Sequence, residues 1–71
     1  MMYEINETGL KKLQLYTGKL IADKIGVNPM TINNLKDGKR KTVNKQTAYC
    51  LTKFFSPESE IEDYFTREEK L

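Results

Sequence analysis

Residues 17–41, TGKLIADKIGVNPMTINNLKDGKRK, constrain the fold more than any other part of this chain. Gly26 follows an apolar pattern of helical spacing, and a glycine just past a helix end commonly adopts a positive φ that disfavours a Cβ. The pair Asn28-Pro29 then restarts a helix, because asparagine caps helix starts and proline suits the first helical position. The stretch therefore predicts one helix over residues 18–25, a tight turn, and a second helix over residues 29–37.

The spacing within this pair of helices indicates how they pack. Helices that cross steeply need a small residue where they approach, a glycine at the turn, and apolar anchors on the second helix. These structural positions are filled by Ala22, Gly26, Ile32 and Leu35. Such spacing is typical of a DNA-binding helix-turn-helix, whose second helix enters the major groove.

The remaining sequence predicts further helices around this pair. Asn6 or Thr8 can cap a helix that reaches about Tyr16, and Asn44 can cap another that begins at Lys45. The cap-and-proline signature of Ser56-Pro57 predicts a last helix over residues 57–65.

The expected fold is all-α, a compact bundle of four to five helices. Residues 1–6 are expected to form only a short extended arm. The chain is expected to be one domain over residues 1–71, with the helix-turn-helix at 17–38 and an acidic helix and tail at 57–71.

Composition narrows the function classes. The chain has 71 residues, one cysteine (Cys50) and no histidine, which leaves no internal disulfide and little for metal or acid–base chemistry. No glycine-rich phosphate loop is present, so we expect neither an enzyme nor a cofactor nor a metal site. No apolar run approaches the roughly 20 residues of a membrane span, and no signal peptide is apparent, so we expect a cytoplasmic protein without a membrane partner.

Charge is distributed unevenly along the sequence. Residues 1–53 contain ten Lys or Arg and four Asp or Glu, a net charge of +6, whereas residues 54–71 contain two and six, a net charge of −4. A basic body with an acidic tail favours a polyanionic partner on one face.

The two helices, the turn and the segment Leu35-Lys36-Asp37-Gly38-Lys39-Arg40 together resemble the Cro and phage-repressor helix-turn-helix, also called the xenobiotic-response-element family. The resemblance is close over residues 17–41 and looser over residues 6–65. It implies a lambda-repressor-like DNA-binding domain, encoded by a bacterium or phage, that acts as a small Cro-like repressor. It also implies a homodimer that occupies a palindromic operator and blocks polymerase by occlusion. The sequence departs from the family pattern at Pro29, where the family often carries Gln, Ser or Arg. Proline has no hydrogen-bond donor with which to contact a base.

The outward face of the helix over residues 29–37 supplies the predicted base-reading residues. They are, in order of preference, Asn34, Met30, Asn33 and Thr31. An amide side chain can bind the N6 and N7 edge of adenine, and an apolar side chain can pack on a thymine methyl group.

The predicted phosphate contacts surround this helix. They are Thr17, Lys19, Asn28, Lys39, Arg40, Lys41 and Lys45. Helix N-termini bind phosphate through their free N–H groups, and cations beside the recognition helix add affinity without sequence information.

Two alternatives remain open at this point. One is a helical bundle that binds no DNA. The other is a protein-binding module, an antirepressor or antitoxin that keeps the helix-turn-helix fold. Ile61, Tyr64 and Phe65 either close the core or contact a second copy or an opposing repressor. DNA binding should weaken with salt, whereas an apolar protein contact should not.

Overall fold

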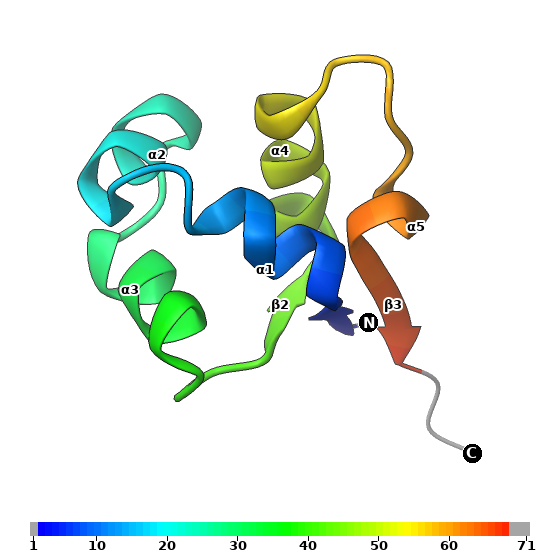
Figure 1. The fold of residues 1–71 in the computed structure, drawn as a ribbon, viewed down its shortest axis with the longest axis horizontal. Helices are drawn as coiled ribbons and strands as arrows, with labels where there is room; N and C mark the ends of the chain where they lie inside the picture. Colours follow the sequence, from blue (N-terminus) through cyan, green and yellow to red (C-terminus); the bar gives the residue numbers. More distant parts are fainter. Residues whose placement is uncertain (1, 69–71) are drawn as a thin grey trace.

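The computed structural model describes residues 2–68, and these residues form five helices and three strands (Figure 1). In chain order the elements are β1 (Met2–Ile5), α1 (Glu7–Leu13), α2 (Gly18–Ile25), α3 (Pro29–Asp37), β2 (Thr42–Asn44), α4 (Lys45–Phe55), α5 (Ile61–Tyr64) and β3 (Phe65–Glu68). The bounds of α2 and α3 coincide with the predicted ones, and α4 begins at the predicted Lys45. Helix α1 ends at Leu13, earlier than the predicted Tyr16.

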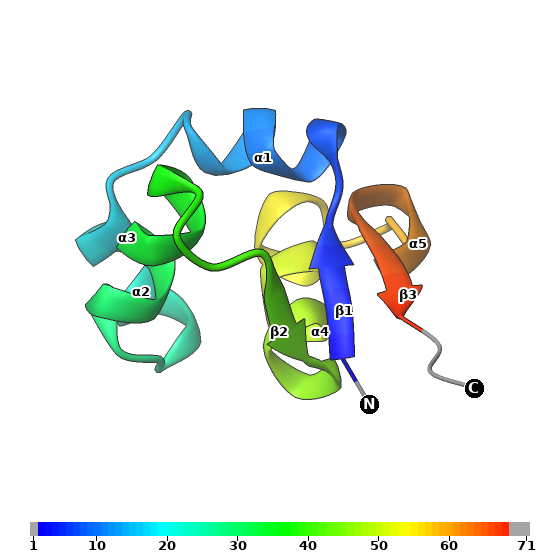
Figure 2. The same cartoon turned by 90° about the horizontal axis from the view of Figure 1, so that it is seen from below.

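The expectation of an all-α fold is wrong, because the three strands form one antiparallel sheet in the order β2-β1-β3 (Figure 2). Strand β1 lies in the middle, where Tyr3 is opposite Val43 on one side and Arg67 on the other. The protein is a small mixed α/β fold. The predicted N-terminal arm is therefore the central strand of this sheet.

The sheet is held to the helices by one buried aromatic or aliphatic side chain from each strand. Tyr3, Val43 and Phe65 are 5%, 1% and 1% exposed. Each strand has only three or four residues, too few to display the alternation that identifies a strand from sequence. From the sequence alone, Phe65 of β3 therefore fits the end of the predicted helix over residues 57–65.

The predicted C-terminal helix over residues 57–65 is also wrong. Ser56 is extended, with φ −158° and ψ 114°, because a proline follows it and disfavours the helical region. The chain then turns, and α5 comprises only Ile61–Tyr64. Glu60 and Asp63 form a capping box that starts this short helix, each side chain accepting a hydrogen bond from the other residue's backbone.

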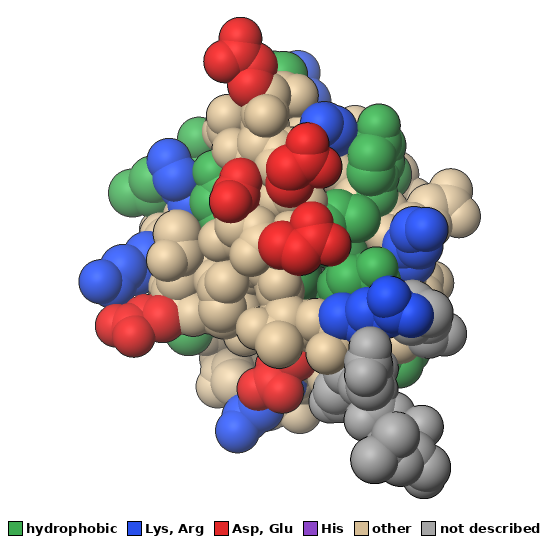
Figure 3. Space-filling model, turned by 90° about the vertical axis from the view of Figure 1, so that its right-hand side faces the viewer, with side chains coloured by type: hydrophobic (Ala, Val, Ile, Leu, Met, Phe, Trp, Pro, Cys, Tyr) green, Lys and Arg blue, Asp and Glu red, His purple; other side chains and the backbone are tan. Residues whose placement is uncertain are grey.

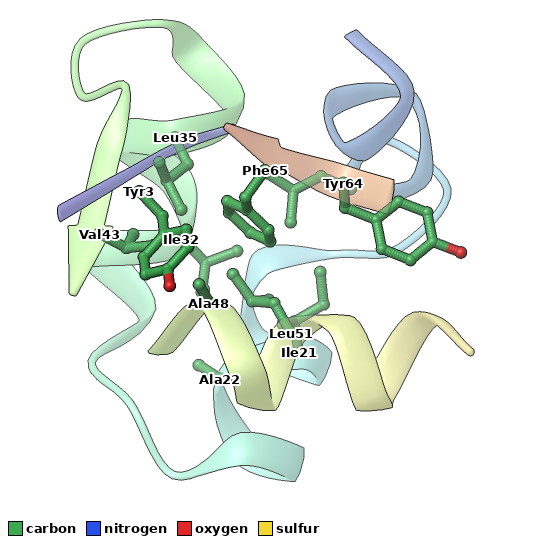
Figure 4. Close-up of a cluster of buried hydrophobic side chains, with 11 residues drawn as sticks. Tyr3, Ile21, Ala22, Ile32, Leu35, Val43, Ala48, Leu51, Tyr64 and Phe65 are labelled. Atoms are coloured by element: carbon green, nitrogen blue, oxygen red, sulfur yellow. The ribbon is translucent and has the colours of Figure 1, made fainter. Parts of the chain in front are cut away.

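The core lies where α2, α3 and α4 meet the sheet, and Figure 4 shows side chains from both layers pointing toward one another. The least exposed apolar residues of the helices are Leu13, Ile21, Ile32, Leu35, Ala48 and Leu51. Among the residues whose side chains the structure describes, Thr52 is the one buried polar residue, and its hydroxyl donates to the Ala48 carbonyl over 2.9 Å. Leu20 of α2, although apolar, is 43% exposed. No helix within residues 2–68 is long and apolar enough to cross a membrane.

Candidate nucleic-acid interface

The turn between α2 and α3 has the geometry that its residues predict. The Thr17 hydroxyl accepts a hydrogen bond from the Leu20 N–H over 3.1 Å and so caps the start of α2. Gly26 ends the helix with φ 75°, and its N–H donates to the Ala22 carbonyl over 2.8 Å. A Cβ at this left-handed position would be strained, so the tight turn depends on glycine.

Helix α3 is fixed to the rest of the protein by one face. Asn28 caps it, its side chain accepting a hydrogen bond from the Met30 N–H over 2.8 Å, and Pro29 occupies the first helical turn. Ile32 and Leu35 are 0% and 1% exposed, and Ala22 of α2 is 2% exposed. The structure therefore places the predicted structural residues in the contact between α2, α3 and the core.

The opposite face of α3 is open. Met30 is 67% exposed, Asn33 is exposed, and Thr31 and Asn34 are half-buried. The α3 backbone is further held at its end, where the Arg40 N–H donates to the Asn34 carbonyl over 3.1 Å. Met30 and Asn34 lie one helical turn apart, so both lie on the same side of the helix.

Asn33 has a neighbour that sequence reasoning missed. A Cβ built on Gly18, the first residue of α2, would overlap the carboxamide oxygen of Asn33. The Asn33 side chain thus lies against the start of α2, and only a glycine leaves room for it. The pairing joins the two helices of the motif and directs this amide toward α2.

Replacing Gly18 by alanine is expected to displace the Asn33 carboxamide while the fold persists. The overlapping atom belongs to the end of a flexible side chain, and alanine favours a helix more than glycine does, so the free energy of unfolding should change by less than about 1 kcal/mol. The side-chain NH₂ resonances of Asn33 report the displacement by NMR. Unchanged Asn33 resonances, or a domain that no longer folds, would contradict this packing.

Helix α3 is also tied to the segment between α1 and α2, by contacts that no sequence pattern indicates. The Lys36 ammonium donates to the Tyr16 carbonyl over 2.7 Å, and the Gln14 amide donates to the Lys36 carbonyl over 3.1 Å. Lys36 is half-buried, so this cation has a structural role beside the exposed ones. These bonds hold α3 in a fixed orientation relative to the segment between α1 and α2.

The basic loop, residues 39–41, follows α3 directly. All three side chains are exposed. The Arg40 Nε donates to the Thr42 carbonyl over 2.8 Å, and the Lys41 carbonyl accepts from the Ile5 N–H over 3.0 Å. The loop is therefore anchored to β1 and β2, which holds its cations beside the end of α3.

The other predicted phosphate contacts lie at helix starts. Thr17 and Asn28 use their side chains as caps for α2 and α3, while Lys19 and Lys45 are exposed in the first turns of α2 and α4. Strand β2 separates Lys45 from the basic loop by three residues, about 10 Å of extended chain.

The predicted protein-contact residues are mostly part of the core. Tyr64 and Phe65 are 6% and 1% exposed, and Ile61 is half-buried against the core. The Tyr64 ring packs edge-on to Phe55, with ring centroids 5.2 Å apart. Of the two alternatives left open for these residues, Tyr64 and Phe65 follow the first: they close the core and join α5 and β3 to α4.

Charge separates the molecule into two sides. Residues 17–41 carry six Lys or Arg and two acids, Asp23 and Asp37, a net charge of +4. Figure 3 shows the side on which α5 lies, where acidic side chains gather. In Figure 1 this side is opposite α2 and α3. The positive charge is therefore concentrated on the helix-turn-helix, on the side away from α5.

Comparison with known proteins adds nothing to this geometry. No protein-family model, curated protein or solved structure matches the chain.

Proposed function

We propose that this protein is a sequence-specific DNA-binding regulator that inserts α3 into the major groove of an operator. The observation that carries the proposal is that α3 has one buried face and one exposed face. Its buried face is fixed by Ile32 and Leu35, while its free face presents Met30 and Asn34 beside the basic loop. A rigid helix with free polar and apolar groups can read base edges, and flanking cations can hold the phosphates.

The sequence resemblance extends this proposal. It supports a small Cro-like repressor, bacterial or phage-encoded and cytoplasmic, that occupies a palindromic operator as a homodimer. Repression then follows because the bound protein excludes polymerase. Two half-sites one DNA turn apart would be read by two copies of α3.

Fluorescence anisotropy tests the proposal most directly. The purified protein is titrated into random duplex DNA and into the DNA flanking its own gene, over about 50 to 300 mM salt. We expect binding that weakens with salt and that favours the flanking DNA. Absence of binding at the lowest salt would refute DNA binding, and equal binding to both duplexes would refute sequence specificity.

The basic loop makes a separate prediction within this assay. Lys39→Ala should weaken binding to both duplexes equally and reduce the slope of log K against log salt by about one, because one phosphate contact is lost. Lys11→Ala is the matched control, since Lys11 is exposed on α1 and paired with Glu7 at 3.7 Å. If the two variants had the same salt slope, the basic loop would not contact phosphate.

A further inference from the structure

A cleft lies between α2 and α4, away from the free face of α3. Its volume is about 430 Å³, and it is lined by Lys24, Ile25, Tyr49, Cys50, Lys53 and Phe54. This volume falls within the roughly 300–1,000 Å³ of ordinary binding clefts. None of the lining residues belongs to α3 or to the basic loop, so a second partner can occupy the cleft.

The cleft has apolar surface that the fold leaves uncovered. Tyr49, at the middle of α4, is 52% exposed. On α2, Leu20 is 43% exposed and lies one turn before Lys24, on the same side of the helix. Tyrosine is one of the residue types that contribute most to protein–protein contacts, so Tyr49 is the apolar group of the cleft best suited to a partner.

The cleft is also strongly basic. Two of its six lining residues are lysines, Lys24 and Lys53, and none is acidic. Within residues 2–68, no hydrogen bond or ion pair engages the Lys24 ammonium. The Lys53 ammonium donates to the Pro57 and Ser59 carbonyls, each over 3.1 Å, and lies 5.5 Å from the Tyr49 ring centre. An ammonium has three donors, so Lys53 retains one for a carboxylate.

The chain itself carries a segment of the complementary chemistry. In the acidic segment, residues 58–62, Glu58 and Glu62 are exposed and Ile61 is half-buried. The Glu60 carboxylate is used in the capping box of α5, whereas no ion pair engages Glu58 or Glu62 in the described part of the chain. The bonds from Lys53 hold the start of this segment in place, so its carboxylates are presented without much loss of entropy.

Within one molecule only the Lys53 side of the cleft meets the acidic segment, through the bonds to the Pro57 and Ser59 carbonyls, whereas Lys24 lies on α2, away from this segment. Figures 1 and 2 both show α2 and α5 at opposite ends, with α4 between them. We propose that the α2–α4 cleft of one protomer binds the acidic segment of a second copy, so that protomers associate head to tail. Glu58 and Glu62 reach Lys24 and Lys53, and the exposed part of Ile61 packs on Tyr49.

This contact is heterologous, and it therefore differs from the two-fold contact that a palindromic operator requires. It would join neighbouring molecules and needs no DNA. The proposal stands independently of the proposed function.

Sedimentation velocity of the full chain tests it, from about 10 to 500 μM protein, in about 50 mM and about 500 mM salt. At low salt the average sedimentation coefficient should rise with concentration, and at high salt it should not, because the charges are screened. Lys24→Glu and Glu62→Lys should each weaken association about tenfold or more, since like charges then face each other. Lys11→Glu, the same charge change on α1, should leave association unchanged.

Mixing the two disabling variants gives the decisive result. Lys24→Glu keeps an intact acidic segment, and Glu62→Lys keeps an intact cleft. An equimolar mixture should therefore associate more strongly than either variant alone, because the intact segment of one variant can bind the intact cleft of the other. The proposal is overturned if the wild-type protein stays monomeric at low salt, if it stops at a symmetric dimer, if Lys11→Glu weakens association as much as Lys24→Glu, or if the mixture fails to associate.

Discussion

Phe65→Ala is expected to lower the free energy of unfolding by about 3–5 kcal/mol, a large part of the stability of a domain this small. Phe65 is 1% exposed and pairs with Ile5 across the β1–β3 ladder, so its loss leaves a cavity between the sheet and the helices. In the all-α fold expected from the sequence, the same residue would lie at the end of a helix beside a frayed tail. The substitution therefore also tests the sheet.

Urea unfolding followed by circular dichroism measures this effect, with the midpoint and slope compared between variants. Thr66→Ala is the matched control, because Thr66 is the next residue of β3 and is exposed. It should change the free energy of unfolding by about 0.5 kcal/mol or less. A loss of similar size in both variants, or of less than about 1 kcal/mol in Phe65→Ala, would contradict the placement of β3.

Asn34→Ala is expected to cost about 1–3 kcal/mol of discrimination at one operator position, a loss of roughly 5- to 150-fold. Asn34 lies one turn after Met30 on the free face of α3, and its backbone carbonyl is already fixed by Arg40. Removing the side-chain carboxamide of Asn34 should therefore change the recognition of the base pair without moving α3.

Anisotropy titrations with operator variants, each altered at one base pair, measure this loss. Asn33→Ala is the matched control on the same helix, because the Asn33 amide lies against Gly18. We expect it to alter discrimination less than Asn34→Ala does. Intact discrimination in Asn34→Ala would show that Asn34 reads no base, and a larger effect of Asn33→Ala would reverse their roles.

The helix-turn-helix could be predicted because its signals are local. Thr17 and Asn28 cap helices through bonds to residues two or three positions away, and Gly26 adopts its positive φ within one turn. Such contacts depend on neighbouring residues alone, so the bounds of α2 and α3 follow from the sequence.

The sheet could not be predicted because its contacts are remote in sequence. Tyr3 meets Val43 and Arg67, and nothing near any of these residues indicates the others. Phe65 ends an apolar pattern that begins after the cap-and-proline signature Ser56-Pro57, and this pattern considered alone favours a helix. Tertiary pairing decided its structure instead.

Within the candidate site, residue type was predictable but side-chain placement was not. The free face of α3 follows from its periodicity, whereas the packing of Asn33 on Gly18 depends on the angle between two helices. The bond from Lys36 to Tyr16 likewise joins segments whose proximity only the fold creates.

The pairing of β1 with β3 has a consequence for how the protein matures. Met2 lies opposite Glu68, so the central strand lacks one of its neighbours until almost the whole described chain has left the ribosome. Contacts this remote are slow to form, because a long loop must close first. Helices α2 and α3 can form early, but a nascent chain that ends before residue 65 exposes the edge of β1 and lacks Phe65. Nascent chains that end before residue 65 should therefore be substrates for proteases.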